Sequence, residues 1–175
     1  ASGADHWYSM SSHRARAINN EVAQSTFNPG WLRSVGPGWI AWSLESFIDE
    51  IAHKQGKDPV QFRIEMLDGK GKQAGKAPES VGGALRLRNV LKTVSDKVAS
   101  VKLAKDEGIG FSVSSGQERT MPAWLATAAH VHVNRDSGKI TLKKLYVVVD
   151  AGLIVHTDGA LAQIEGSLLW GSSLA

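Results

Sequence analysis

Apolar residues recur at helical spacing in three stretches of the chain. The first stretch predicts a helix from Pro37, a residue suited to the first helical position, to near Gly56. A short helix follows, with Asp58 as its N-cap and Pro59 at its first position. A third helix is predicted over residues 84–100. Its apolar face consists of Leu87, Val90, Leu91, Val94 and Val98.

The helix from Pro37 carries both apolar and acidic residues. Its acidic residues Glu45, Asp49 and Glu50 are expected mostly on faces other than the apolar one. The apolar face consists of Ile40, Leu44, Phe47, Ile48 and Ile51.

The last third of the chain has the pattern of β-strands. Residues 108–116 alternate in polarity, and two longer strands over 124–133 and 139–149 flank a hairpin connection at 134–138. Residues 14–23 do not settle into helical spacing and are also interpreted as a strand. Helices followed by strands predict an α+β fold, with an antiparallel or mixed sheet packed with several helices.

The remaining segments are expected to be irregular. Residues 68–83 are rich in glycine and lysine and predict a flexible surface loop. Residues 1–12 form an irregular lead-in, and residues 28–30 (Asn-Pro-Gly) form a turn.

Composition narrows the class of protein. The 175 residues are 42% hydrophobic and 21% charged, which is typical of a globular chain. Cysteine is absent, which excludes disulfides, zinc–thiolate sites and cysteine-ligated iron–sulfur clusters within this chain. The net charge of +3 is scattered, with no basic stripe for nucleic acid. No apolar run reaches the length of a membrane span, and residues 1–12 lack the pattern of a signal peptide.

The strand–turn–helix pattern from Asp150 to Gly171 is the most suggestive local feature. A strand that ends in a polar turn with glycine, followed by a helix, can present backbone N–H groups to a ligand. Gln163 stands in that helix among apolar residues, where a buried amide would need a partner. Two interpretations stay open: Gln163 contacts a ligand, or it faces water.

A second candidate lies just before the helix that starts at Pro37. Arg33 precedes Ser34, Val35 and Gly36, and the helix N-terminus follows directly. A guanidinium beside free backbone donors and the positive end of a helix dipole can bind an anion. Many loops before helices share this composition.

Histidines give no metal site. His6 and His13 lack metal-ligand spacing, whereas His130 and His132 share one face of a predicted strand and could together hold a metal. No third ligand is evident near that pair, so the structural interpretation is favoured.

Two separated segments resemble one family. Residues 32–36 (LRSVG), 44–52 (LESFIDEIA) and 56–63 (GKDPVQFR) are similar to the large molybdenum subunit of the xanthine dehydrogenase/aldehyde oxidase family. Residues 150–152 (DAG) and 158–171, which include AQIEG, resemble a second segment of that subunit. The form RSVG, with the two segments close together, is typical of the isoquinoline 1-oxidoreductase beta-subunit type of bacterial enzyme.

The resemblance implies roles at matching positions. Arg33 corresponds to an arginine beside the molybdenum cofactor, followed by the loop of Ser34, Val35 and Gly36, and Gln163 corresponds to a glutamine that hydrogen-bonds the pterin. Val35 stands where xanthine dehydrogenase-like members hold a substrate-stacking aromatic residue. These five residues are the predicted cofactor-binding set. The implied cofactor is molybdopterin, as molybdopterin cytosine dinucleotide.

The family's remaining features are missing. The glycine-flanked catalytic glutamate, the glycine-rich pterin segment and the cysteines for [2Fe-2S] clusters are absent. We therefore assign no catalytic base and no metal ligand, and interpret Glu45 and Glu165 as helix or packing residues and Asp150 as a turn cap. Thr157 replaces the proline more usual before Asp158.

The resemblance implies that residues 1–175 are a partial molybdenum cofactor-binding domain, and the apolar run that stops at Ala175 supports truncation. The implied partners are the remainder of the molybdenum subunit, a small iron–sulfur subunit that receives electrons, and a small N-heterocyclic or aldehyde substrate. Neither nucleic acid nor a membrane span is expected, and the compartment is the bacterial cytoplasm or periplasm. By itself the chain is expected to be inactive. The alternatives are a non-catalytic scaffold of the same fold and, less favoured, a stand-alone ligand-binding domain.

Overall fold

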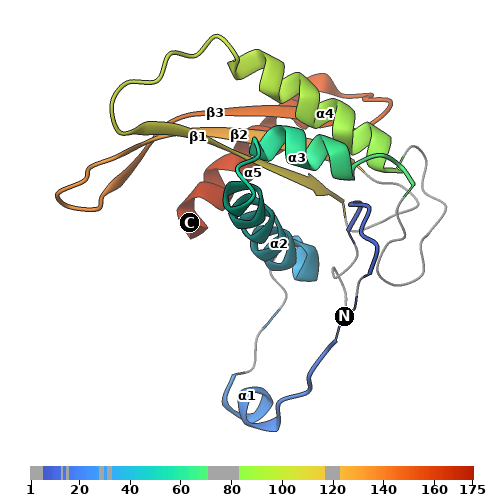
Figure 1. Ribbon diagram of the computed structural model, residues 1–175. Coiled ribbons are helices and arrows are strands. Elements are labelled where there is room, and N and C mark those ends of the chain that lie inside the picture. The colour runs from blue at the N-terminus through green and yellow to red at the C-terminus, as the bar shows by residue number, and fades with distance from the viewer. Residues whose placement is uncertain are drawn as a thin grey trace.

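The computed structural model describes residues 6–12, 14, 16–27, 30, 33–70, 83–116 and 123–175. Helices and strands within these ranges confirm the predicted α+β class (Figure 1). The helices are α1 (Glu21–Thr26), α2 (Val35–Lys54), α3 (Pro59–Met66), α4 (Gly83–Val98) and α5 (Thr157–Leu174). The strands are β1 (Glu107–Ser115), β2 (Trp124–Val133) and β3 (Ile140–Asp150).

The described strands form an antiparallel sheet in the order β1-β2-β3. The predicted hairpin joins β2 to β3, with Asn134 N–H donating to the Lys139 carbonyl at 2.9 Å. Asn134 Oδ1 accepts from the N–H groups of Asp136 and Ser137. Gly138 has a φ of +70°, which suits glycine at the end of this turn. Local side-chain chemistry therefore sets the register of this pair.

Helix α4 lies across one face of the sheet and contacts all three strands (Figure 1). Its predicted apolar residues are all buried. Facing them on β2 are Trp124, Ala126 and Ala128, which alternate along the strand and have no exposed surface. Because alanine has the smallest apolar side chain, the helix can approach the sheet closely here. This contact is the core of the fold.

Helix α2 begins at Val35, ahead of the expected Pro37, and ends as predicted before Gly56. Gly56 has a φ of +63°, and its N–H donates to the His53 carbonyl at 3.0 Å. Lys57 N–H reaches the Ala52 carbonyl at 2.9 Å, which completes the glycine-terminated motif common at helix ends. Asp58 then caps α3, accepting from two backbone N–H groups, as the sequence predicts.

Residues 6–10 pack into the core, although residues 6–12 form no helix or strand. Trp7 and Tyr8 are buried, and the Trp7 ring meets the Trp124 ring edge-on at 4.7 Å between centroids. Trp7 Nε1 donates to Ser115 Oγ at 2.9 Å, and Ser9 N–H donates to the Met66 carbonyl at 2.7 Å. The predicted irregular lead-in is thus a structural part of the domain.

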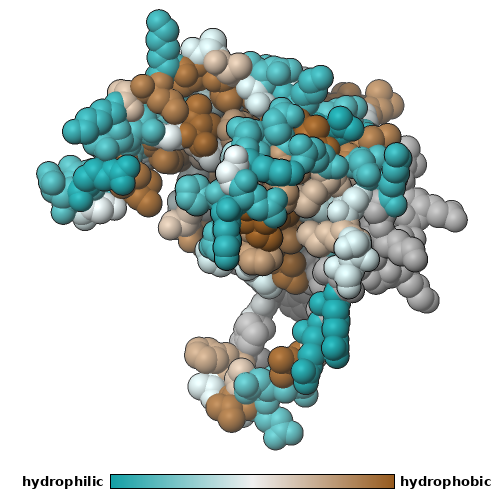
Figure 2. Space-filling view, in the orientation of Figure 1, coloured by the Kyte–Doolittle hydropathy of each residue, from teal (hydrophilic) through white to brown (hydrophobic). Residues whose placement is uncertain are grey.

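The predicted strand over residues 14–23 is wrong. Residues 16–20 have no regular structure, and Glu21 begins the short helix α1. Asn20 caps this helix by accepting the Ala23 N–H at 2.9 Å, while no described strand lies beside the segment to pair with it. Helix α1 has no buried residue and projects away from the body (Figures 1 and 2). The predicted turn at 28–30 and most of the predicted loop at 68–83 lie outside the described residues.

Candidate functional site

The loop before α2 has an unusual backbone. Ser34 has a φ of +72° and Val35 a φ of +48°, both in the left-handed region. A β-branched residue such as valine adopts this conformation only when its surroundings impose it. Gly36 is buried directly behind the loop. At Gly38 an added Cβ would lie 2.1 Å from Ser34 Oγ, so glycine there makes room for the serine.

The N-terminus of α2 has free donors. Ser34 occupies the N-cap position, but its side chain makes no capping hydrogen bond. The first turn of α2 contains no acidic residue. Backbone N–H groups at this end therefore lack a side-chain cap, and the helix dipole favours an anion beside them.

Helix α5 is positioned by the turn that follows β3. His156 Nδ1 accepts the Gly159 N–H at 2.8 Å and so caps the helix. Gly159 is required for this contact, because an added Cβ would lie 2.4 Å from that nitrogen. Thr157 is the first residue of α5. The helix has no buried residue, so the turn and a few side-chain contacts hold it in place.

The two predicted site segments meet. Arg33 Nη1 donates to Gln163 Oε1 at 3.4 Å, across 130 residues of sequence. The same guanidinium lies over the Trp170 ring, 5.5 Å from its centroid. All three side chains are exposed. The hydrogen bond is long, so both polar groups stay available to a ligand.

The structure corrects one premise about Gln163. A buried amide was the reason to suspect this residue, yet Gln163 is exposed and α5 is surface-exposed along its length. What distinguishes Gln163 from other surface amides is its contact with Arg33. Of the other predicted site residues, Ser34 is the N-cap of α2, and Val35 and Gly36 lie in its first turn.

Arg86 of α4 makes a contact that the sequence did not reveal. Its Nε donates to Asp150 Oδ2 at 2.7 Å, and its Nη2 donates to Asp150 Oδ1. Asp150 Oδ1 also accepts the Gly152 N–H at 3.2 Å, which confirms the predicted role of Asp150 as a turn cap. Hydrogen bonding from Arg86 lowers the pKa of Asp150. Arg86 flanks the apolar face of α4, and no residue near it in the sequence indicates that it pairs with Asp150, 64 residues away.

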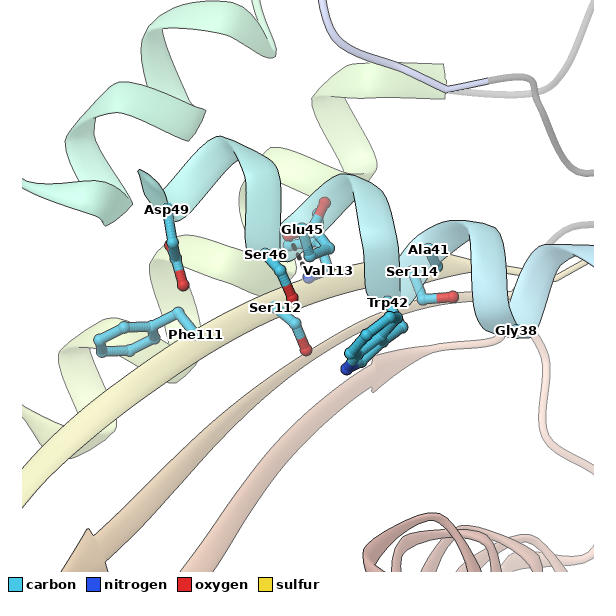
Figure 3. A pocket seen from close by; sticks show the side chains of 10 residues that line it. All are labelled: Gly38, Ala41, Trp42, Glu45, Ser46, Asp49, Phe111, Ser112, Val113 and Ser114. Atoms are coloured by element: carbon cyan, nitrogen blue, oxygen red, sulfur yellow. Dashed lines mark hydrogen bonds between the residues drawn. The ribbon is translucent and has the colours of Figure 1, made fainter. Parts of the chain in front are cut away.

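A cavity of about 330 Å³ lies between α2 and β1 (Figure 3). Figure 3 shows Trp42 and Ser46 of α2 extending toward β1, where Ser112 lies opposite. Two aromatic rings, two carboxylates and several hydroxyls surround the space, a lining that suits a small ligand of mixed polarity. The lining residues are Gly38, Ala41, Trp42, Glu45, Ser46, Asp49, Phe111, Ser112, Val113 and Ser114.

Glu45, at the inner end of this cavity, is fully engaged. Its Oε2 accepts from Arg63 Nε at 2.8 Å and from the Val113 N–H at 3.1 Å, and its Oε1 accepts from Tyr8 Oη at 2.7 Å. Burial raises the pKa of Glu45, and the Arg63 guanidinium opposes that rise. Asp49 is paired with the same guanidinium. Glu45 is therefore a structural carboxylate, which agrees with its interpretation as a helix or packing residue. Its predicted place on a face of α2 other than the apolar one is wrong, because it is buried together with Ile48 and Ala52.

The spacing of residues in α2 could have indicated that Glu45 is buried. Glu45, Ile48 and Ala52 recur at helical spacing, and all three are buried on one face of α2. Glu45 was assigned to another face of α2 because it is charged, and this assignment of its face was wrong. Phe47, placed on the buried face, is instead 58% exposed, and apolar surface is visible over α2 in the centre of Figure 2.

Other candidate residues add no catalytic group. Glu165 is exposed on α5. His130 Nε2 lies 3.0 Å from Glu107 Oε2, so it is held by a carboxylate. Within the described part of the chain no three His, Cys, Asp or Glu residues cluster as a metal site. The structural interpretation of His130 is thus the one that its contacts favour.

The structure brings the Arg33 loop and the surface helix α5 together at one place. The chain matches the family model for the molybdopterin cofactor-binding domain over residues 50–175. It therefore belongs to this family of molybdopterin cofactor-binding domains. Gln163 lies within the matched region, whereas the Arg33 loop precedes it.

Curated relatives agree with this assignment. The chain is 51% identical to the membrane-bound aldehyde dehydrogenase (pyrroloquinoline-quinone) of Gluconacetobacter polyoxogenes, over 98% of this chain and 22% of that protein. It is 27% identical to the beta subunit of isoquinoline 1-oxidoreductase of Brevundimonas diminuta, over 83% of this chain and 17% of that protein. It is also 27% identical to the B subunit of nicotinate dehydrogenase of Pseudomonas putida, over 82% of this chain and 12% of that protein.

These relatives confirm the predicted resemblance to molybdenum subunits of the xanthine dehydrogenase/aldehyde oxidase type, and all three are named as oxidoreductases. The chain spans less than a quarter of the length of each. No helix in the described ranges is both long enough and apolar enough to cross a membrane.

Proposed function

We propose that this chain is the cofactor-binding portion of a molybdenum hydroxylase that oxidises an N-heterocycle or an aldehyde. The observation that carries the proposal is the contact between Arg33 and Gln163, which join a loop and a helix 130 residues apart. Both side chains are exposed and only loosely bonded to each other. Such a pair contributes little to folding, and its position beside a free helix N-terminus suits ligand binding.

The residues present fit a molybdopterin. A guanidinium and uncapped backbone donors favour its phosphate, and an amide can both donate to and accept from the polar edge of a pterin. When bound, the cofactor supplies the redox chemistry that oxidises the substrate carbon. Arg33 would provide positive charge, Gln163 would orient the ring, and the loop from Ser34 to Gly36 would hold its backbone toward the ligand.

The remaining chemistry belongs to other parts of the enzyme. The described carboxylates near the cavity are engaged with Arg63, so this chain offers no general base there. Val35 is half-buried and has no aromatic ring to stack on a substrate. The chain has no cysteine, so a partner subunit would carry the [2Fe-2S] centres that receive electrons. The purified chain, given substrate and an artificial electron acceptor, should show no turnover; robust turnover would refute an incomplete site.

Cofactor analysis of the native complex tests the binding roles. Arg33→Ala and Gln163→Ala should each weaken retention of molybdenum and pterin by about tenfold, as loss of a supporting hydrogen bond does at other cofactor sites. Arg16→Ala and Glu165→Gln, at exposed positions, are the matched controls. Unchanged molybdenum in the Arg33 and Gln163 variants would remove their roles. Release of cytidine monophosphate on hydrolysis would identify the cytosine dinucleotide form.

One other cofactor has specific support. The name of the 51% identical relative includes pyrroloquinoline-quinone, an acidic quinone that would also suit a cationic loop. Mass spectrometry of the extracted cofactor separates a quinone from a pterin. A complex that contains neither molecule would instead favour a non-catalytic scaffold of the same fold.

A further inference from the structure

We propose that Arg86 is a positioning residue, which orients the turn after β3 and thereby sets the place of Gln163 on α5. The proposal rests on the proposed cofactor-binding function of Gln163. Arg86 itself lies on α4, the helix that forms the core with the sheet, and it makes no described contact with Gln163.

The first step is the fork between Arg86 and Asp150. Two nitrogens of one guanidinium bond the two oxygens of one carboxylate, which fixes the plane of the carboxylate as well as its distance. Asp150 is the last residue of β3 and pairs with the fully buried Trp124 of β2. The fork therefore joins the rigid core to the point where the chain leaves the sheet.

The second step is the turn. Asp150 Oδ1, oriented by Arg86, also accepts the Gly152 N–H at 3.2 Å. Gly152 has a φ of +71° and nothing within 4 Å of an added Cβ, so packing around this glycine does not hold the turn. Leu153 and Val155 are 91% and 92% exposed. The carboxylate of Asp150 is thus the described group that directs the chain toward α5.

The third step is the helix. Helix α5 has no buried residue, so its direction depends on the turn and on the His156 cap. Turning the first residues of α5 would move Gln163 away from Arg33, because a helix moves as a rigid unit over this length. A half-exposed ion pair adds little stability, which leaves orientation as the effect expected of Arg86.

Hydrogen exchange on the chain and cofactor retention in the native complex test the inference together. Arg86→Ala should speed amide exchange in residues 151–164 while β2 and α4 keep their protection, and should weaken cofactor retention by about tenfold. Arg86→Lys keeps the charge without the fork, so it should restore only part of both effects. Arg88→Ala, the same substitution on the same helix, is the control and should change neither.

A double variant shows whether Arg86 acts through Gln163. If it does, Arg86→Ala combined with Gln163→Ala should lose no more cofactor than Gln163→Ala alone. Additive losses would overturn the proposal, as would faster exchange throughout β2 and α4. If the wild-type complex contains no pterin, the proposed function fails, and unchanged exchange in residues 151–164 would separately overturn the positioning role.

Discussion

Arg63 and Glu45 form a buried ion pair between α3 and α2, with Nε 2.8 Å from Oε2 and no exposed surface on the arginine side chain. Arg63 Nη2 also donates to the Glu45 carbonyl at 2.9 Å, and Nη1 donates to the Pro59 carbonyl at 3.1 Å. Burial lowers the pKa of Arg63, but its contacts with Glu45, Tyr8 and Asp49 together raise that pKa above its ordinary value. The pair joins the two helices beside β1, where Glu45 also accepts the Val113 N–H.

Removal of Arg63 from its ion pair with Glu45 should lower the stability of the fold strongly. Arg63→Met leaves the Glu45 carboxylate buried without its cation, so the free energy of unfolding should fall by about 3–5 kcal/mol in urea titration. The control is Lys57→Met, which breaks the exposed pair with Glu65 and should cost about 1 kcal/mol or less. Equal effects of the two variants would contradict a structural role for the buried pair.

Tyr8→Phe tests the docking of the N-terminal segment. The variant removes the hydroxyl that donates to Glu45 Oε1 at 2.7 Å but keeps the ring in the core. A buried acceptor left without its donor should lower the free energy of unfolding by about 1–3 kcal/mol. Tyr146→Phe removes the same hydroxyl from a half-buried ring and should leave stability within about 0.5 kcal/mol. A neutral result at Tyr8 would show that its hydroxyl does not anchor the segment.

Glu107 should make stability depend on acid pH. Its carboxylate accepts the Ala104 N–H and faces His130, and these contacts, helped by Lys143, lower its pKa to about 2. Because the folded-state pKa lies below the ordinary value of 4.5, this stabilisation is full above that pH. It is lost as pH falls from 4.5 toward 2.

Thermal unfolding of wild type and Glu107→Gln across that range is the measurement. The difference in stability between the wild type and the variant should shrink as the pH falls, since the glutamine does not titrate. A constant difference between the two proteins from about pH 5 to about pH 2 would contradict the lowered pKa.

The effect of Gly38→Ala on the free energy of unfolding should change sign when Ser34 is replaced by glycine. Gly38→Ala alone places a Cβ against Ser34 Oγ, so it should destabilise α2 or displace the loop that carries Arg33. In a Ser34→Gly background the obstruction is gone, and glycine tolerates the φ of +72° at that position. Alanine at position 38 should then stabilise the helix by about 0.5–1 kcal/mol over glycine.

Thermal unfolding of the four combinations measures this coupling. The same sign for Gly38→Ala in both backgrounds would show that the serine does not obstruct position 38. Crystallographic or NMR data on Gly38→Ala should then show the loop unmoved.

Sequence patterns predicted most of the described elements and the buried face of α4, but failed at two places. The apolar face of α4, the cap of α3 and the β2–β3 hairpin followed from neighbours within a few residues. The same approach failed at residues 14–23, where an asparagine cap begins a short helix with no buried residue. It also placed Glu45 off the apolar face of α2, whereas Glu45 is buried on that side beside a cation 18 residues away.

The sequence by itself determined helices α2 to α5, strands β1 to β3, the α+β class and the family, since each depends on local spacing or on motif residues that can be read directly. Tertiary structure decided which residues meet. The contacts of Arg33 with Gln163, of Arg86 with Asp150 and of Tyr8 with Glu45 join segments with no local relation. They depend on how helices pack against the sheet, and a periodic pattern records the face that a residue occupies but not the residue opposite it.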